Sequence, residues 1–298
     1  TSRVEQILNK GASHQPIVSA YKVSQLLNFF SETLESLLHK EAHFVLCVRA
    51  LYSTSNRTFL DLWDVHSSKT RTMVMGVSVY DLSPPHFVAD TVAIVTELLT
   101  VFEASVSSDS EKNHADEFLP VLSAAFDPLV NHCQTLARTL PGGDQEVFLI
   151  NCLTTACEPL KKYNFTQPRV EMYTFLAQDT LKTLLKGQAK HTLQKLGLTD
   201  IVVALRENRK DAAVLQPTTL QSTMKNFYTN LFTLGVLSLP LIDKLVSRPM
   251  RADARRGVAL EIISVYEEIY HSVKSIGDGT VCSHSPDEVR TLLEVDKA

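Results

Sequence analysis

Several features that would mark a particular class of protein are missing from this chain of 298 residues. Its longest apolar run, around residues 234–242, is shorter than the roughly 20 residues needed to cross a bilayer, and Gly235 and Pro240 interrupt it. The first ten residues lack the basic start and apolar core of a signal peptide, and the first residue is Thr1 rather than Met. We therefore expect a soluble intracellular protein, present here as a fragment or a processed form.

The chain also lacks an excess of positive charge and a dense set of cysteines. It has 29 Lys and Arg against 33 Asp and Glu, a formal charge of −4, which argues against a nucleic-acid-binding surface. Five scattered cysteines without a C-x-x-C pair do not form a disulfide scaffold, so we expect free thiols. A hydrophobic content of 44% excludes wholesale disorder.

Glycine is scarce, at 10 residues, and alternating strand patterns are nearly absent, whereas apolar residues recur three or four positions apart. One such stripe consists of Val23, Leu26, Leu27, Phe30, Leu34, Leu37 and Leu38. Others predict helices at 88–102, 118–140, 144–163, 166–196, 198–205, 218–232, 237–246 and 258–276. Ser285 and Glu288 predict a capping box for a last short helix that begins at Pro286.

Two passages leave alternatives open. Residues 70–80 are rich in Val and Thr, as a strand would be, but no second strand-like run stands nearby to pair with them. We therefore interpret them as the frayed end of a helix. At Pro128 the helix either kinks or restarts with Asp127 as its cap. The recurring helical periodicity predicts an all-α chain, and because no repeat of fixed length occurs we expect irregular bundles rather than a regular repeat array. The Pro141–Asp144 turn divides these bundles into residues 1–143 and 144–298.

Catalytic chemistry finds little support. His39 and His43 are four residues apart, but Lys40 stands where a zinc protease needs its glutamate, and no third ligand can be named. Cys133 follows His132, so on a helix the two side chains diverge, and Cys133 lies on an apolar stripe. Glycine-rich phosphate loops and a G-x-S-x-G elbow are absent. We predict no catalytic residue, no cofactor, no metal site and no small-molecule substrate.

Two groups of basic residues are candidates for an interaction surface. Arg248, Arg251, Arg255 and Arg256 would share one face of a helix that begins near Pro249. On another predicted helix, Lys182, Lys186 and Lys190 lie nearly opposite Leu184. Either group could meet anionic lipid or an acidic partner helix. Alternatively, these long side chains only solvate the outside of a bundle.

The ordered set of several segments resembles the C-terminal part of subunit 6 of the conserved oligomeric Golgi complex, over nearly the whole chain. These segments are residues 20–27, 121–129, 164–172, 195–198, 266–270 and 283–293. The resemblance is less clear at 207–217 and after Leu293, and the family's N-terminal coiled-coil region is not in this chain.

The resemblance implies a non-enzymatic subunit of a vesicle-tethering complex, peripheral on the cytosolic face of the Golgi, that acts in retrograde transport within the Golgi and keeps glycosylation enzymes in place. It implies an elongated rod of successive helical bundles. Its partners would be sister subunits, SNARE proteins and Rab GTPases, with an acidic membrane surface as a further candidate and no nucleic acid. Without the resemblance, the same residues would fit a generic helical scaffold or adaptor, or a subunit of a related tether such as the exocyst.

Overall fold

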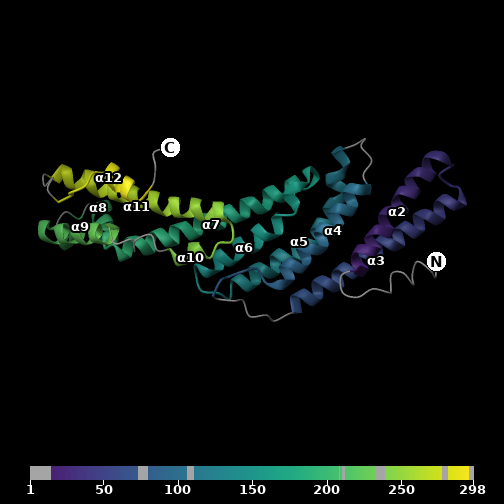
Figure 1. Ribbon diagram of the computed structural model, residues 1–298, viewed down its shortest axis with the longest axis horizontal. Coiled ribbons are helices and arrows are strands. Elements are labelled where there is room, and N and C mark those ends of the chain that lie inside the picture. Colours follow the sequence, from purple (N-terminus) through teal and green to yellow (C-terminus); the bar gives the residue numbers. More distant parts are fainter. Residues whose placement is uncertain are drawn as a thin grey trace. The chain divides into compact units, whose positions relative to one another are not determined.

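The computed structural model describes residues 15–72, 80–105, 111–207, 209, 212–232, 239–276 and 281–294. Within these ranges every regular element is a helix, which confirms the all-α prediction (Figure 1). No helix there is both long enough and apolar enough to span a membrane. The chain divides into two compact units: unit 1 comprises residues 1–139 and 152–177, and unit 2 comprises 140–151 and 178–298.

Unit 1 contains four long helices: α2 (Gln15–Leu37), α3 (His43–Thr72), α4 (His86–Ser105) and α5 (Glu111–Ala137). It also includes the end of α6 (Asp144–Cys157), the 3₁₀ turns η1 (Leu160–Lys162) and η2 (Asn164–Thr166), and the start of α7 (Gln167–Lys195). Helices α2 and α3 pair as a hairpin, α2 also contacts α4, and α5 contacts α3, α4 and η2.

Aromatic side chains form the centre of unit 1. The ring of Tyr21 on α2 lies 5.0 Å from that of Phe59 on α3, and Phe118 on α5 lies 4.9 Å from Phe102 on α4 and 5.5 Å from Phe165 of η2. Tilted and edge-on aromatic pairs of this kind stabilise a core beyond the area they bury. The centre of unit 1 thus joins residues from five separate elements.

Unit 2 contains the start of α6, the end of α7 and the helices that follow α7 in the described part of the chain. These are α8 (Leu198–Arg206), η3 (Ala213–Leu215), α9 (Pro217–Phe232), α10 (Pro240–Asp243), α11 (Arg248–Ile276) and α12 (Pro286–Leu292). Gly197 ends α7 with a left-handed φ of 70°, a conformation that glycine adopts without strain. On the apolar stripe of α11, Val258, Ile262 and Ile269 are fully buried.

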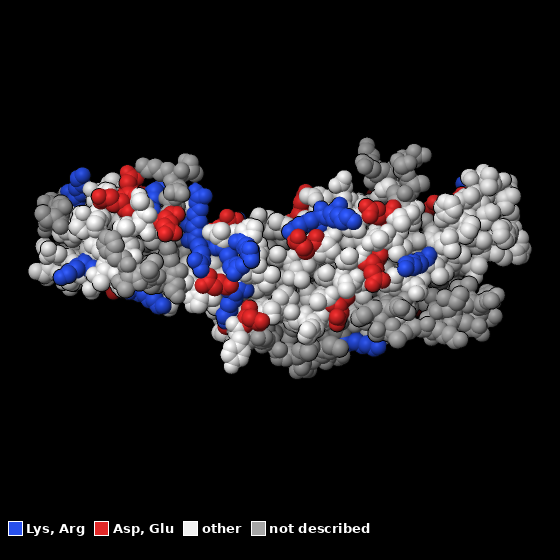
Figure 2. All heavy atoms as spheres, in the orientation of Figure 1, with Lys and Arg blue, Asp and Glu red and all other residues white. Residues whose placement is uncertain are grey.

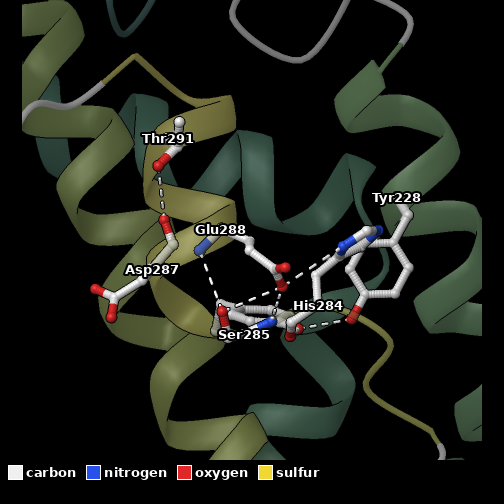
Figure 3. A network of polar contacts seen from close by, with 7 residues as sticks. Tyr228, His284, Ser285, Asp287, Glu288 and Thr291 are labelled. Carbon is white, nitrogen blue, oxygen red and sulfur yellow. Dashed lines mark hydrogen bonds and ion pairs between the residues drawn. The ribbon is translucent and has the colours of Figure 1, made fainter.

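The predicted capping box at the last helix is confirmed. The Ser285 hydroxyl accepts a hydrogen bond from the Glu288 backbone N–H at 3.3 Å, and the Ser285 N–H donates to the Glu288 carboxylate at 2.6 Å (Figure 3). These two bonds satisfy donors that a helix start otherwise leaves free. The backbone N–H and hydroxyl of Ser285 also lower the pKa of the Glu288 carboxyl, because they bind its charged form.

Several predicted boundaries are wrong. Helix α6 ends at Cys157 rather than near Tyr163, because Pro159 follows and the chain continues in 3₁₀ turns. In the predicted helix 237–246 the described part contains only the four-residue α10, which Pro240 begins. At Pro128, where two alternatives were open, α5 continues without a restart, and Asp127 pairs with Arg169 of α7 at 2.5 Å.

Two further differences concern α2 and α3. The 30-residue α3 was not predicted, apart from its end at Thr72, which falls in the passage 70–80 that we interpreted as the end of a helix. Residues 73–79 of that passage lie outside the described ranges. The predicted helix at 23–38 exists as α2, but its stripe is not buried in the core of unit 1: Leu26, Phe30 and Leu37 are 55%, 46% and 73% exposed.

Candidate interaction surface

The four arginines lie on the first three turns of α11, in unit 2. The helix begins at Arg248, and the Ser247 hydroxyl accepts a hydrogen bond from the Met250 N–H at 3.4 Å. Pro249 fits the first turn, where its missing N–H has no helical partner to lose. The helix that carries the arginines and the predicted helix 258–276 are therefore one continuous α11.

The four arginines are not equally available for binding. Arg255 forms an ion pair with Asp243 of α10, and Arg251 reaches the Asp243 backbone carbonyl at 3.5 Å. Arg248 and Arg256 are exposed, and among the described residues neither makes a hydrogen bond or an ion pair. The surface over α10 and the start of α11 accordingly shows basic side chains gathered around a few acidic ones (Figure 2).

A buried asparagine holds the segment that leads into the arginines. Asn151 of α6 is 1% exposed; its amide nitrogen donates to the Lys244 carbonyl at 2.9 Å, and its amide oxygen accepts from the Val246 N–H at 2.8 Å. The ammonium of Lys244 also lies 3.9 Å from the Asp144 carboxylate, near the start of α6. Asn151 thus fixes the α10–α11 connection through backbone atoms on both sides of Leu245.

Replacing Asn151 with Ala is expected to destabilise unit 2 by about 2 kcal/mol, because two part-buried backbone groups lose their partners and each loss costs about 1 kcal/mol, the lower end of the usual range. Urea denaturation followed by circular dichroism measures the change. The control is Asn226→Ala, since Asn226 is an exposed residue of α9. A loss no larger than that of the control would show that the Asn151 amide contributes nothing to holding this connection.

The lysine stripe lies on the unit 2 part of α7. Lys182, Lys186 and Lys190 are exposed, while Leu184 is 1% exposed and packs inward. The neighbouring Leu185 lies against Gly257 of α11, where a Cβ atom would come within 3.0 Å of a leucine methyl. Close contact at this glycine joins α7 to α11, so both basic groups belong to helices that pack together in unit 2.

The other predicted candidates remain apart. His39 lies in the turn after α2 and His43 is the first residue of α3, so the two exposed histidines do not share a helical face. Within the described ranges, no group of three or more His, Cys, Asp or Glu residues is arranged to hold a metal ion. Cys133 is buried beside Cys152. A hydrogen bond with Cys133, together with burial, raises the pKa of the Cys152 thiol. A thiol kept neutral in this way is a poor nucleophile.

The adjacent carboxylates of α11 point to different partners. Glu267 pairs with Arg290 of α12 at 3.0 Å, and Glu268 pairs with Arg206 of α8 at 2.8 Å. The Arg206 guanidinium lowers the pKa of the Glu268 carboxyl because it favours the charged form. Both carboxylates therefore connect helices of unit 2, and they do not converge on a common substrate position.

A hollow in unit 1 was not predicted. It has a volume of about 680 Å³, and its lining includes Tyr163, Phe165, Lys162, Glu103 and Glu171. The Lys162 ammonium lies 5.1 Å from the centre of the Tyr163 ring. These residues come from α4, from η1, η2 and Tyr163 between them, and from α7, so no local spacing in the sequence could reveal the hollow. Its charges are mixed, since two carboxylates, one ammonium and the imidazole of His114 line it.

Comparison with known proteins decides the family. A sequence model described as "Conserved Oligomeric Golgi complex subunit 6, C-terminal" matches residues 1–293. The chain belongs to this family. Curated relatives with the name "Conserved oligomeric Golgi complex subunit 6" share 25% identity in Arabidopsis thaliana, 25% in Rattus norvegicus and 26% in Homo sapiens. Each alignment covers 98% of this chain but only 49%, 45% and 45% of the relative, so the chain spans about half the length of these subunit 6 proteins.

Proposed function

We propose that this chain is part of subunit 6 of a conserved oligomeric Golgi complex and acts there by binding other proteins, without catalysing a reaction. The observation that carries the proposal is the family match over residues 1–293, supported by relatives of this name in a plant and in mammals. The described surfaces are consistent with it, because the buried thiols and the diverging carboxylates offer no assembled catalytic group.

In this role the chain would associate with sister subunits and lie peripherally on the cytosolic face of the Golgi. We further propose that it contributes to retrograde transport within the Golgi, and so to the retention of glycosylation enzymes, through contacts with SNARE proteins and Rab GTPases. The elongated rod of helical bundles stays a prediction. Long amphipathic helices suit such contacts, because one apolar helix face can pack against a partner while the other face stays in the bundle.

Affinity capture of the full-length protein from cells tests the proposal. The protein is tagged at its end, captured under mild conditions, and its partners are quantified by mass spectrometry against a capture of the tag alone. Sister subunits of the Golgi complex are expected in near-equal amounts with the bait. Enrichment of exocyst subunits would support a related tether instead, and the absence of any stable set of subunits would support a generic scaffold and overturn the proposal.

The arginines of α11 are our candidate for contact with an acidic membrane surface. Arg248 and Arg256 are exposed and, within the described part of the chain, free of ion pairs. Each basic residue near an acidic membrane adds about 1 kcal/mol, so removing both attractions costs about 2 kcal/mol, or about 30-fold in binding. The double variant Arg248→Glu, Arg256→Glu is therefore expected to sediment far less with liposomes that contain phosphatidylserine.

The control for this prediction is the double variant Lys186→Glu, Lys190→Glu, which makes the same change of charge on the exposed face of α7. It should retain most of the sedimentation if the arginines form the contact. Equal losses in both variants would show that only net charge matters. Undiminished sedimentation of the arginine variant would mean that Arg248 and Arg256 simply solvate the surface.

A further inference from the structure

Helix α2 has two apolar faces, and unit 1 uses only one of them. The first face, which includes Ile17 and Tyr21, is buried against α3 and α4. The second face lies about half a turn away. We call it the α2 stripe, and it consists of Val23, Leu26, Leu27, Phe30, Leu34 and Leu37.

The ring contact and the polar bonds that fix α2 against α3 lie on or beside the first face. The Tyr21 ring packs 5.0 Å from Phe59, and the Ser55 hydroxyl of α3 donates to the Ala20 carbonyl at 3.4 Å. Farther along α2, the Glu35 carboxylate pairs with Arg49 of α3 at 2.5 Å. Helix α3 is therefore fixed along the length of α2 on one side, and it leaves Leu26, Phe30 and Leu37 of the α2 stripe exposed.

The α2 stripe is a continuous apolar surface. Its residues recur at spacings of three and four over four turns, which is the pattern of a seam that packs against another helix. Leu26, Phe30 and Leu37 are 55%, 46% and 73% exposed, and the neighbouring Phe29 is 53% exposed, whereas Val23, Leu27 and Leu34 are half-buried along one edge of the stripe. Single exposed apolar residues are common, but a contiguous row of them marks an interaction surface.

We propose that in the full-length polypeptide the α2 stripe packs against a helix of the segment that precedes residue 1. The relatives are about twice as long as this chain, and the matched family region is the C-terminal one, so they carry most of their remaining length ahead of it. Such a segment would enter only fourteen residues before α2, which begins at Gln15.

A short covalent connection favours this occupant over a separate subunit. A covalent connection this short keeps the preceding segment at an effective concentration near α2 that is well above the concentration of a free partner protein in a cell. A helix with its own apolar face, held this close to α2, therefore occupies the stripe first. The inference rests on the family membership and does not depend on which proteins the full complex binds.

Site-directed photo-cross-linking of the full-length protein tests the inference. p-Benzoylphenylalanine replaces Phe30 in one variant and Phe175 in another; Phe175 is a 69% exposed residue of α7 and serves as the control. After irradiation of the purified protein, linked peptides are identified by mass spectrometry. We expect position 30 to link within the same chain to one helix ahead of residue 1, and position 175 to give no such link.

Isotope mixing separates this result from the other occupants. Links between labelled and unlabelled copies would assign the stripe to a second copy of the protein, and links to a sister subunit in the captured complex would assign it to that subunit. Either result, or the absence of links above the Phe175 control, overturns the inference. Because capture of the complex does not depend on the stripe, failure here leaves the proposed function intact.

A second measurement needs no cross-linker. The variant Leu26→Glu, Phe30→Glu places two charges on the α2 stripe without touching the buried face of α2. Limited proteolysis of the full-length protein should then cut the preceding segment at least about fivefold faster, because cleavage follows the population of the undocked state. Phe175→Glu should leave that rate unchanged. An unchanged rate in the stripe variant also overturns the inference.

Discussion

Replacing Trp63 with Ala is expected to lower the free energy of unfolding by about 3–5 kcal/mol, the usual cost of deleting a large buried aromatic side chain. Trp63 is 1% exposed, and its ring packs 6.3 Å from that of Phe59 and 5.7 Å from that of His66. The indole N–H also donates to the Ala124 carbonyl of α5 at 2.7 Å. The variant therefore loses packing within α3 and the direct bond between α3 and α5 together.

The variant Trp63→Phe separates these two contributions. It keeps most of the ring volume but leaves the Ala124 carbonyl without its donor, so we expect a loss of about 1–3 kcal/mol. Urea denaturation of the 298-residue chain followed by circular dichroism measures both variants, because Trp63 is the only tryptophan and its fluorescence disappears with it. Leu60→Ala, at a 39% exposed position of α3, is the surface control. If Trp63→Ala cost no more than this control, α3 would not be anchored to α5 through the indole.

The presence of α3 itself could not be predicted from its apolar pattern. Its middle contains the polar run Ser53–Thr58, which breaks the recurrence of large apolar residues. In the structure Ser55 is 3% exposed and bonds to the Ala20 carbonyl of α2. A small polar residue can lie in a helix interface when a backbone acceptor faces it, and sequence periodicity does not detect such a pair.

By contrast, the helices with continuous apolar stripes were predicted well. In α4 the predicted positions Val88, Val95, Leu98, Leu99 and Phe102 are all buried, as are Phe118, Leu122 and Cys133 in α5. The α2 stripe shows the limit of this reasoning. Periodicity reveals that a helical face is apolar, but it does not reveal whether the partner of that face is present in the same chain.

The arginine surface shows a similar limit. Spacing alone placed the four arginines on one helix, as observed, but it gave no sign that Asp243 would neutralise Arg255. That pairing depends on where the α10–α11 connection is held, and Asn151, more than 90 residues earlier in the chain, holds it. Long-range bonds through a single buried side chain have no signature in a local sequence pattern.

The second large effect is expected at Tyr266, where Tyr266→Ala should cost about 3–5 kcal/mol. The Tyr266 ring is fully buried and stacks on Phe227 of α9 at 5.3 Å with 14° between the planes. Its hydroxyl lies 2.6 Å from that of Tyr228 and donates to the His284 carbonyl at 2.5 Å. Tyr228 also bonds to the His284 backbone, next to the capping box of α12 (Figure 3). Tyr266 thus connects α9, α11 and the segment that leads into α12.

The variant Tyr266→Phe removes only the hydroxyl, and its effect should concentrate in residues 281–294. We expect a loss of about 1–3 kcal/mol, together with faster amide hydrogen exchange in α12. Tyr270→Phe is the control, because this residue is half-buried on the same helix and contributes no hydroxyl bond to His284 among the described contacts. Unchanged exchange in α12 would mean that the capping box and the Arg290–Glu267 ion pair hold the last helix without Tyr266.

High pH gives an independent test of the same hydroxyl. Burial and the neighbouring Tyr228 hydroxyl raise the pKa of Tyr266 above its ordinary value, so the folded state keeps a proton that the unfolded state gives up. The stability from this proton is fully present below the unfolded pKa of about 10 and falls as the pH rises above it. Other buried tyrosines, such as Tyr21 and Tyr173, add to this loss in the parent chain. Between neutral pH and a pH of about 11, the free energy of unfolding should therefore fall less in Tyr266→Phe than in the parent chain. Equal falls in the two proteins would show that the Tyr266 hydroxyl is already exposed to solvent.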